Sequence, residues 1–189
     1  IGAYDATGSS SKLTSVAGQA PLVNLSIANF RSAAQANGTG YQIWDIHAND
    51  MLQVLFIIEF ATLNSQSIME GVDNGSSAIN SGAADSHKGS SGTAVSGSSA
   101  MSYRGIENLY GNVWQFCDGV NFEDNQPWVC EDATNYQSDL FATPYVNTSY
   151  TATSSGSNYY IKSLGFDSVH PYAQFTTDDS GSASTYYAD

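Results

Sequence analysis

Residues 103–118 read Tyr-Arg-Gly-Ile-Glu-Asn-Leu-Tyr-Gly-Asn-Val-Trp-Gln-Phe-Cys-Asp and form the most strongly patterned stretch of the chain. Gly111 and Asn112 are a turn dipeptide, since both residue types tolerate a positive φ. Apolar residues alternate on either side of this turn, as they do in half-buried strands. We therefore predict a hairpin at this position, with core residues Ile106, Leu109, Val113 and Phe116.

The second half of this stretch, residues 113–117, is predicted to be a strand. Successive side chains of a strand point to opposite faces, so Trp114 and Phe116 share one face. Large aromatic side chains in alternation are usually buried, and we expect this face to pack into the core. On the residues alone, a well-packed hairpin in which Asn112 and Trp114 have structural roles is the favoured interpretation.

The same residues carry a family resemblance. The pattern Gly-Ile-x-Asn-Leu-x-Gly-Asn-Val-Trp-x-Phe over residues 105–116 resembles the signature Gly-Leu-x-Asp-Met-x-Gly-Asn-Val-Trp-Glu-Trp of the formylglycine-generating-enzyme superfamily, a branch of the C-type lectin fold. With Tyr103 and Arg104 ahead of it, the stretch looks most like a subgroup of phage and prophage surface proteins. Residues 30–33 and 53–66 are similar to the same subgroup, so the resemblance spans most of the chain.

This resemblance implies an α+β fold of the C-type lectin, formylglycine-generating-enzyme-like type. Two helices would pack on small antiparallel sheets joined by long loops, in a single domain over residues 1–189. The subgroup continues through further C-terminal strands that this sequence does not contain. The implied function is that of a tail-fibre or receptor-binding domain on a virion or in the extracellular space. It would recognise a host surface receptor or glycan without chemistry, as a homotrimer.

Two alternatives to receptor binding remain open at this point. The first is a structural role, in which the domain decorates a virion or forms a filament subunit. The second is a fragment of a copper oxidase, because enzymes of the superfamily hold copper with two cysteines in their C-terminal part. Neither Cys117 nor Cys130 matches those ligands in position, and Gln115 replaces the glutamate of the enzyme-type signature.

Two helices are predicted upstream of the motif. Ser26 can cap a short helix that ends before Gly38, and Asp45 can cap a longer one. Residues 51–63 are apolar nearly all round, which is typical of a buried central helix. Glu59 is the single charge in that run, and a buried carboxylate requires a partner. We expect an ion pair between Glu59 and Arg104.

Two further features concern the loops and the cysteines. Residues 74–102 are rich in Gly and Ser and are predicted to be a long loop that is too polar to pack a core. Cys117 and Cys130 flank a turn region and could face each other across a hairpin. The spacing allows a disulfide in an oxidising compartment and equally allows two free, half-buried thiols.

Composition narrows the classes of partner. The chain has 189 residues with five Lys plus Arg against 18 Asp plus Glu, a formal net charge of -13. This charge argues against nucleic-acid binding, which needs cations that contact phosphates. The longest apolar run is too short for a membrane span of about 20 residues, so no membrane insertion is predicted. Acidic excess commonly serves solubility, and calcium stays open as a ligand, although no calcium-loop spacing is present.

No catalytic residue and no cofactor are predicted. The chain has three His, none of them in a nucleophile motif, and its Cys and His lack the spacing of a zinc site. The remaining features suit a binding surface, because Tyr, Ser, Gly and Asn are the residues of adaptable recognition sites. The candidate ligand-binding residues are Tyr186, Tyr187 and Trp128.

Overall fold

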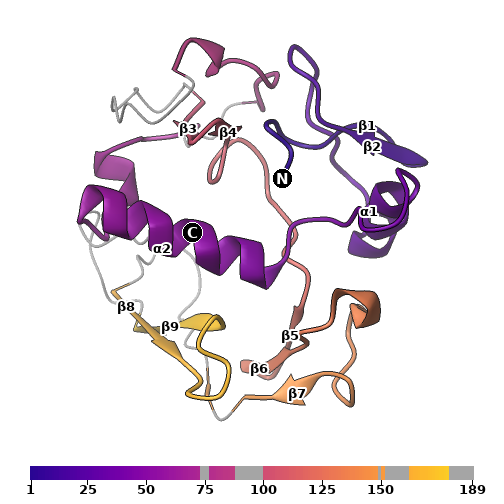
Figure 1. The fold of residues 1–189 in the computed structure, drawn as a ribbon, viewed down its shortest axis with the longest axis vertical. Helices are drawn as coiled ribbons and strands as arrows, with labels where there is room; N and C mark the ends of the chain where they lie inside the picture. The colour runs from indigo at the N-terminus through magenta and orange to yellow at the C-terminus, as the bar shows by residue number, and fades with distance from the viewer. Residues whose placement is uncertain (73–76, 88–99, 149, 152–161, 179–189) are drawn as a thin grey trace. The chain divides into compact units, whose positions relative to one another are not determined.

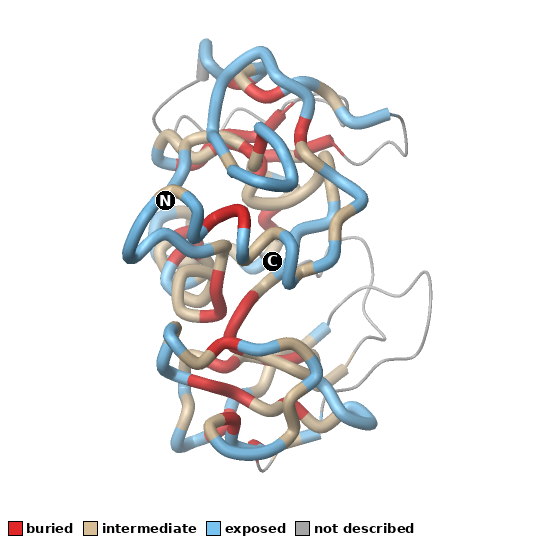
Figure 2. The backbone as a smooth tube through the Cα atoms, turned by 90° about the vertical axis from the view of Figure 1, so that its right-hand side faces the viewer, coloured by how far each residue is buried: buried red, intermediate tan, exposed pale blue. Residues whose placement is uncertain are grey.

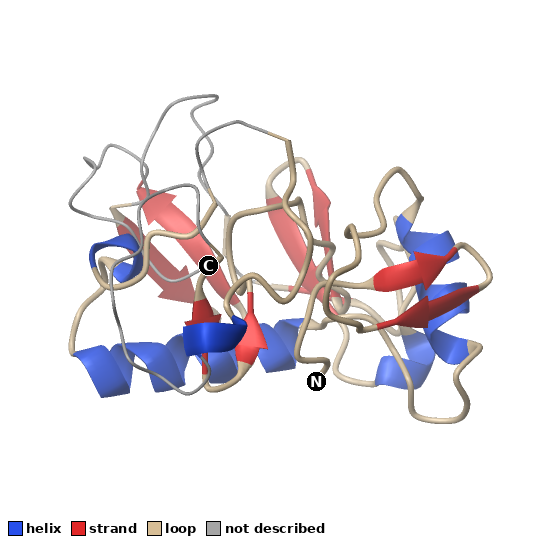
Figure 3. Cartoon of the chain, turned by 90° about the horizontal axis from the view of Figure 1, so that it is seen from above, coloured by secondary structure: helices blue, strands red, loops and turns tan. Residues whose placement is uncertain are grey.

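The structure is a computed structural model that describes residues 1–72, 77–87, 100–148, 150–151 and 162–178 (Figure 1). The chain forms two compact units. Unit 1 combines Ile1–Ile43 with Ser65–Gln115, and unit 2 combines Trp44–Asn64 with Phe116–Ala188. In the described residues the fold is of the α+β class, with two α-helices and several small antiparallel sheets (Figure 3).

Unit 1 contains a hairpin, a helix and the first half of the patterned stretch. The hairpin joins β1 (Thr7–Ser9) and β2 (Lys12–Thr14), and α1 spans Ile27–Gln35. Ser26 caps α1 as predicted, because its hydroxyl accepts from the Asn29 amide at 3.2 Å. Two 3-10 turns, η1 (Ser65–Ser67) and η2 (Asp85–His87), precede the short pair of β3 (Ser102–Tyr103) and β4 (Ile106–Glu107).

The turn of the patterned stretch forms as predicted. Gly111 has φ +82° and Asn112 has φ +64°. A Cβ on Gly111 would lie 2.8 Å from the Val72 backbone nitrogen, so glycine is required both for the dihedral and for the close approach. The Asn112 amide donates to the Val72 carbonyl at 2.9 Å. The turn therefore packs directly onto another backbone segment of unit 1.

A polar cluster, the Asp5 hub (Asp5, Asn108 and Asn112), fixes the turn to the start of the chain. The Oδ2 atom of Asp5 accepts from Asn108 Nδ2 at 2.7 Å and from Asn112 Nδ2 at 2.8 Å. Beside it, the buried Glu107 carboxylate accepts from the backbone amides of Gly82 and Ala84. Part of the predicted loop 74–102 is thus packed, because Glu107 supplies the acceptors that its backbone needs.

The prediction that residues 113–117 form a strand with a buried face is wrong. Trp114 is 102% exposed and Phe116 is exposed, while the predicted core residues Ile106, Leu109 and Val113 are only half-buried. After the Val113 amide donates to the Gly111 carbonyl, the next backbone pairing is that of Asp118. Within the described residues, 113–117 therefore have no neighbouring strand against which one face could be buried.

Unit 2 is built from one long helix and two small sheets. The helix α2 spans Ile46–Phe60 and is capped by Asp45, as predicted. One sheet has the order β5 (Val120–Glu123), β6 (Gln126–Val129), β7 (Val146–Asn147), and the other pairs β8 (Ser163–Phe166) with β9 (Gln174–Asp178). A further 3-10 turn, η3, spans Ala133–Asn135.

The prediction that α2 is buried all round is wrong. Only Ile46, Leu52 and Phe56 are buried, and Figure 2 shows that buried backbone occurs in short runs. Glu59 is exposed, so its carboxylate needs no partner to offset desolvation. Because Glu59 and Arg104 belong to different units, their ion pair stays a prediction. None of the described helices is long and apolar enough to cross a membrane.

Replacing Asp5 tests the hub. One oxygen of Asp5 accepts both side-chain bonds, so in D5N the amide oxygen can keep both and the buried charge is removed. Burial raises the pKa of Asp5, so the natural chain loses stability as pH rises through that pKa. We expect D5N to exceed the natural chain in unfolding free energy at pH 7, with a difference that shrinks toward pH of about 4.

The matched variant is D5A, which leaves the Asn108 amide buried without an acceptor. We expect it to lose about 2 kcal/mol of unfolding free energy. Urea unfolding followed by circular dichroism between pH 4 and pH 7 measures both variants. Equal destabilisation of D5N and D5A would contradict the account.

Candidate functional site

The candidate site lies on unit 2, next to a small hydrophobic core. This core consists of Ile46, Val129, Ala173 and Phe175, with partly buried side chains around it. Val120 packs against this core and pairs with Val129 across the β5–β6 hairpin. Phe122 follows Val120 by two residues on β5, so both side chains are on the same face of the sheet. The apolar core therefore continues outward along β5.

Three rings, the aromatic ladder (Phe122, Phe175 and Tyr150), connect this core to the surface. Phe175 is buried, and its ring centroid lies 5.7 Å from that of Phe122 at an interplanar angle of 90°. The ring of Tyr150 lies 6.0 Å from Phe175 at 19°. Both geometries are favourable for aromatic pairs. Phe122 remains 50% exposed, so the ladder ends in an aromatic ring that solvent can reach.

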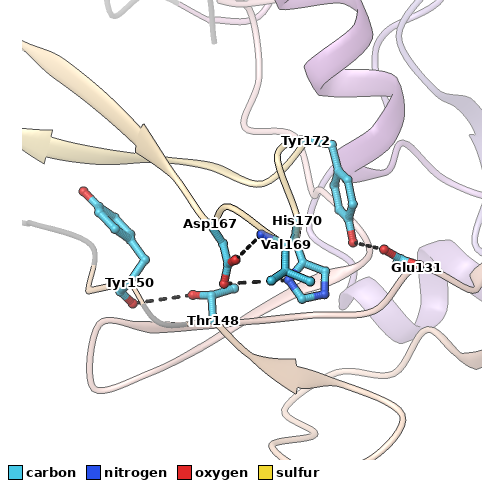
Figure 4. Close-up of polar contacts among 7 residues, drawn as sticks. All are labelled: Glu131, Thr148, Tyr150, Asp167, Val169, His170 and Tyr172. Atoms are coloured by element: carbon cyan, nitrogen blue, oxygen red, sulfur yellow. Dashed lines mark hydrogen bonds and ion pairs between the residues drawn. The ribbon is translucent and has the colours of Figure 1, made fainter.

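Gly165 on β8 makes room for the ring of Tyr150. It pairs with Phe175 on β9, and a Cβ at this position would lie 2.6 Å from Thr177 Cγ2 and 3.0 Å from Tyr150 Cε2. The backbone of Tyr150 is held from the other side, because its carbonyl accepts from the Thr148 hydroxyl at 3.5 Å (Figure 4). The ring of Tyr150 therefore packs beside Gly165 and Phe175.

The hydroxyl of Tyr150 makes no hydrogen bond to any of the residues that the structure describes. Burial of the ring raises the pKa of Tyr150, so its hydroxyl is protonated at neutral pH. Gln126 donates to Thr151, and the hydroxyls of Ser163 and Thr177 are hydrogen-bonded to each other beside the ion pair of Lys162 and Asp178, whose charged atoms lie 2.9 Å apart. The β8–β9 pair of unit 2 therefore carries an exposed ion pair as well as neutral hydrogen-bonding groups.

A second cluster surrounds Tyr172 (Figure 4). The Tyr172 hydroxyl donates to Glu131 at 3.1 Å, and its ring lies 4.2 Å from that of His47 on α2. Burial and the Glu131 carboxylate raise the pKa of Tyr172. The ring of His170 meets Tyr172 edge-on at 6.0 Å. His170 Nδ1 lies 3.7 Å from Asp167 Oδ2, which is an ion pair only when the imidazole is protonated.

An imidazole beside a carboxylate is part of a catalytic triad, but a triad also needs a nucleophile bonded to the imidazole. Among the described residues no hydroxyl or thiol is hydrogen-bonded to His170, and its Nδ1 is buried without a hydrogen-bond partner. Asp167 instead accepts from the Val169 amide at 2.6 Å, and the His170 amide donates to the Asp167 carbonyl. These contacts hold the turn between β8 and β9.

Both cysteines are free; Cys117 is half-buried, as in the second of the two predicted arrangements, whereas Cys130 is buried. The Cys130 amide donates to the Gly119 carbonyl, and the hairpin register therefore sets Gly119, not Cys117, opposite Cys130. Burial, followed by the charges of Asp45 and Asp118, raises the pKa of Cys117 to about 12. Burial also raises the pKa of Cys130.

The predicted ligand-binding residues are placed as follows. Trp128 is half-buried beside a core cluster of Cys130, Tyr136 and Tyr145, and its ring meets Phe141 edge-on at 6.2 Å. Its Nε1 is buried and has no hydrogen-bond partner in the described part of the chain. Tyr186 and Tyr187 lie outside the described residues. The ligand role of all three stays a prediction.

Two of the predicted structural residues, Arg104 and Asn112, have polar contacts within unit 1. Arg104 donates from Nε to the Tyr103 hydroxyl at 3.0 Å and lies over that ring, and Asn112 is part of the Asp5 hub. In the ranges that the structure describes, no three His, Cys, Asp or Glu side chains are placed to hold a metal ion. No protein-family model, curated protein or solved structure matches this chain.

The aromatic ladder could not be recognised from the sequence. The one available signal was the alternation of Val120 and Phe122 ahead of the turn at Asp124 and Asn125, which both have positive φ. That alternation predicts a shared face but not the contact with Phe175, which lies far along the chain. Gly165 likewise has no local feature that indicates a ring packed against it.

Thiol labelling tests the environment of Cys117. Because only the thiolate reacts, a pKa of about 12 makes the native thiol a poor nucleophile at pH 8. We expect iodoacetamide to modify Cys117 in the folded C130S variant on the order of a hundred times more slowly than in urea. Mass spectrometry over time measures the rate. Labelling of the folded protein at the rate of the unfolded chain would contradict the burial described here.

Proposed function

We propose that this chain is a non-enzymatic recognition domain on a virion or extracellular surface, which binds a host surface ligand by shape and aromatic contact. The observation that carries the proposal is the exposure of Trp114. Its side chain is 102% exposed, as in an extended peptide, although it follows a turn that is packed on both sides. A partner that covers an indole of this kind gains about 2–3 kcal/mol of apolar burial.

The surroundings of Trp114 support recognition by contact area. The Asp5 hub and the close approach of Gly111 to Val72 fix the turn that precedes it. An aromatic side chain that follows a fixed turn loses little conformational freedom when a ligand binds, which favours affinity. The phage or prophage character of the domain rests on the resemblance of residues 103–118 to that subgroup.

A structural role is the second candidate function, and one observation favours it. Met51, Val54 and Ile58 on α2 are exposed and follow each other at spacings of three and four residues, which gives a single apolar stripe. Such stripes bury themselves against other helices. A contact between subunits along α2 would serve a homotrimeric fibre as well as a filament.

The copper-oxidase alternative has less support. Copper binding requires both thiols to lose their protons, and burial raises the pKa of both cysteines, which makes that loss more costly. The hairpin register also sets Gly119 opposite Cys130, so the two thiols are not paired across the ladder. We therefore propose a recognition function in preference to a copper-dependent oxidase function.

Cell binding by the W114A variant tests the proposed function. The assay incubates fluorescently labelled protein with a panel of bacterial strains and measures retained fluorescence. We expect W114A to lose at least about tenfold in affinity for any strain that the natural chain binds. Its unfolding free energy should change by no more than about 0.5 kcal/mol, because the side chain is exposed.

The matched control is Y41A, which removes another exposed aromatic side chain of unit 1 and should leave binding unchanged. Undiminished binding by W114A, or turnover of a substrate by the purified chain, would overturn the proposal.

The I58E variant tests the subunit contact. Ile58 is 72% exposed on the apolar stripe of α2, so a charge there disrupts an interface but not the fold of the chain. We expect I58E to convert an oligomer to a monomer in size-exclusion chromatography with light scattering. V169E changes a residue that is 74% exposed elsewhere and should keep the oligomer. An unchanged oligomer in I58E would exclude this stripe as the contact.

A further inference from the structure

Residues 79–84 of unit 1 are bound in the way that a protein binds a peptide. Groups that lie far away along the chain hold the backbone of Ile79, Ser81, Gly82 and Ala84. The loop of residues 16–19 lies on one side of the segment, and the side chains of Glu107 and Asn112 lie on the other. These three parts of unit 1 are named the cradle.

The loop side of the cradle binds Ser81. The Ser81 amide donates to the Gln19 carbonyl at 2.9 Å, and the Ser81 carbonyl accepts from the Gly18 amide at 2.6 Å. The Ser81 hydroxyl shares its proton between the carbonyl oxygens of Val16 and Gln19, at 2.8 and 2.9 Å, and the residue is buried. Main-chain bonds that hold a segment, together with a small pocket for one of its side chains, are a recurring mode of peptide recognition.

The other side of the cradle binds backbone groups through side chains. Asn112 Oδ1 accepts from the Ile79 amide at 2.9 Å, and Asn112 Nδ2 donates to the Ile79 carbonyl at 3.3 Å. The Glu107 carboxylate accepts from the Gly82 amide at 2.9 Å and from the Ala84 amide at 3.1 Å. Such bonds satisfy the backbone of the bound segment. They would form equally well with the same segment of another chain.

Gly82 sets the sequence that the cradle accepts. Its φ is +86°, and a Cβ there would lie 2.8 Å from Ala17 Cβ, so no other residue fits without strain. Ala84 is buried, which leaves room for a small side chain only, whereas Ala83 is exposed. The required pattern is therefore Ser-Gly-x-Ala, with a free choice at the third position.

The way the segment is attached to the rest of unit 1 allows another copy to bind it. Val72 and Ala100 are both buried and belong to the packed part of the unit. Residues 73–76 connect Val72 to the segment, and residues 88–99, which are largely Gly and Ser, lead from it to Ala100. The shorter connection can span at most roughly 18 Å at 3.6 Å per residue. A second cradle within that distance can be reached.

We propose that the cradle is a peptide-binding site, and that two copies of this chain exchange residues 79–84 between their cradles. In a single chain the segment fills its own cradle and blocks the entry of another. In a pair of chains each cradle takes the segment of its partner and makes the same hydrogen bonds. Exchange of an identical element is a low-cost route to association. The cradle does not include Trp114, so this inference is independent of the proposed recognition function.

Peptide binding to the full chain tests the cradle. The probe is a fluorescein-labelled peptide with the sequence of residues 77–87, followed by fluorescence polarisation. In Gly82→Val the chain's own segment no longer fits, because a β-branched residue is added at a positive φ. We expect G82V to bind the peptide with a Kd on the order of 100 µM. The natural chain should bind it at least about tenfold more weakly, since its tethered segment competes.

Three controls assign this binding to the cradle. A83V changes the exposed neighbour of Gly82 and should bind the peptide as weakly as the natural chain does. The double variant G82V/E107A lacks the carboxylate and should not bind the peptide. A peptide with Val in place of Gly82 should not bind G82V.

S81A covers the case in which G82V does not fold. It keeps the glycine and removes only the hydroxyl contacts, so the chain holds its own segment less tightly. We expect S81A to bind the natural peptide at least about threefold more tightly than the natural chain does.

Complementation between two variants tests the exchange. E107A has an intact segment and a damaged cradle, whereas G82V has an intact cradle and a damaged segment. We expect immobilised G82V to capture at least about fivefold more E107A than immobilised A83V does, because the cradle of A83V is already filled.

The results that overturn the inference are specific. The cradle is overturned if neither G82V nor S81A binds the peptide more tightly than the natural chain at up to about 1 mM, or if G82V/E107A binds it as well as G82V. Equal capture of E107A by G82V and A83V overturns the exchange between copies.

Discussion

Unit 2 depends on the side chain and backbone of Asp45. Its Oδ1 accepts from the Ala48 amide at 2.9 Å and so starts α2, while its Oδ2 accepts from the Tyr136 hydroxyl at 3.3 Å. The neighbouring backbone pairs with Asp118, because the Ile46 amide donates to the Asp118 carbonyl and the Asp118 amide donates to Trp44. Asp45 and its backbone neighbours thus connect the start of α2 with the end of residues 103–118 and with the segment after β6. The cap alone contributes about 1 kcal/mol.

The same arrangement accounts for the electrostatics of the core of unit 2. Asp45 and Asp118 are both buried and lie beside each other, so neighbouring groups that would become negative are held in their neutral form. Burial and the Asp45 carboxylate raise the pKa of Tyr136, and burial with both carboxylates raises the pKa of Cys117. The Tyr136 hydroxyl and the Cys117 thiol therefore stay protonated in this core.

The parts of the fold that follow from local chemistry could be predicted from the sequence. Ser26 and Asp45 cap helices through bonds to amides three residues away, and the turn at Gly111 and Asn112 follows from backbone preferences. The exposure of Trp114 could not be predicted in this way. Alternation indicates which side chains share a face, but burial also needs a second surface, and residues 113–117 have none in the described chain.

The candidate site was beyond sequence analysis for a related reason. Phe122 and Phe175 belong to different sheets, and their contact depends on where two hairpins pack on α2. The same holds for Cys117. The hairpin sets Gly119 opposite Cys130, and the register would have to shift by two residues to set Cys117 there, so the two thiols stay free. Glu59 was expected to be buried because its neighbours in the sequence are apolar. The composition of a helix does not indicate which of its sides faces solvent, and Glu59 lies on the exposed side.

The β5–β6 hairpin separates the residues that its backbone conformation requires from the residue that it exposes to solvent. Asp124 and Asn125 both have positive φ, so the turn itself accepts few residue types. Phe122 stands two residues before the turn, pairs with Pro127 across it, and is half in solvent. An exchange at position 122 would thus alter the exposed ring while the turn and register persist.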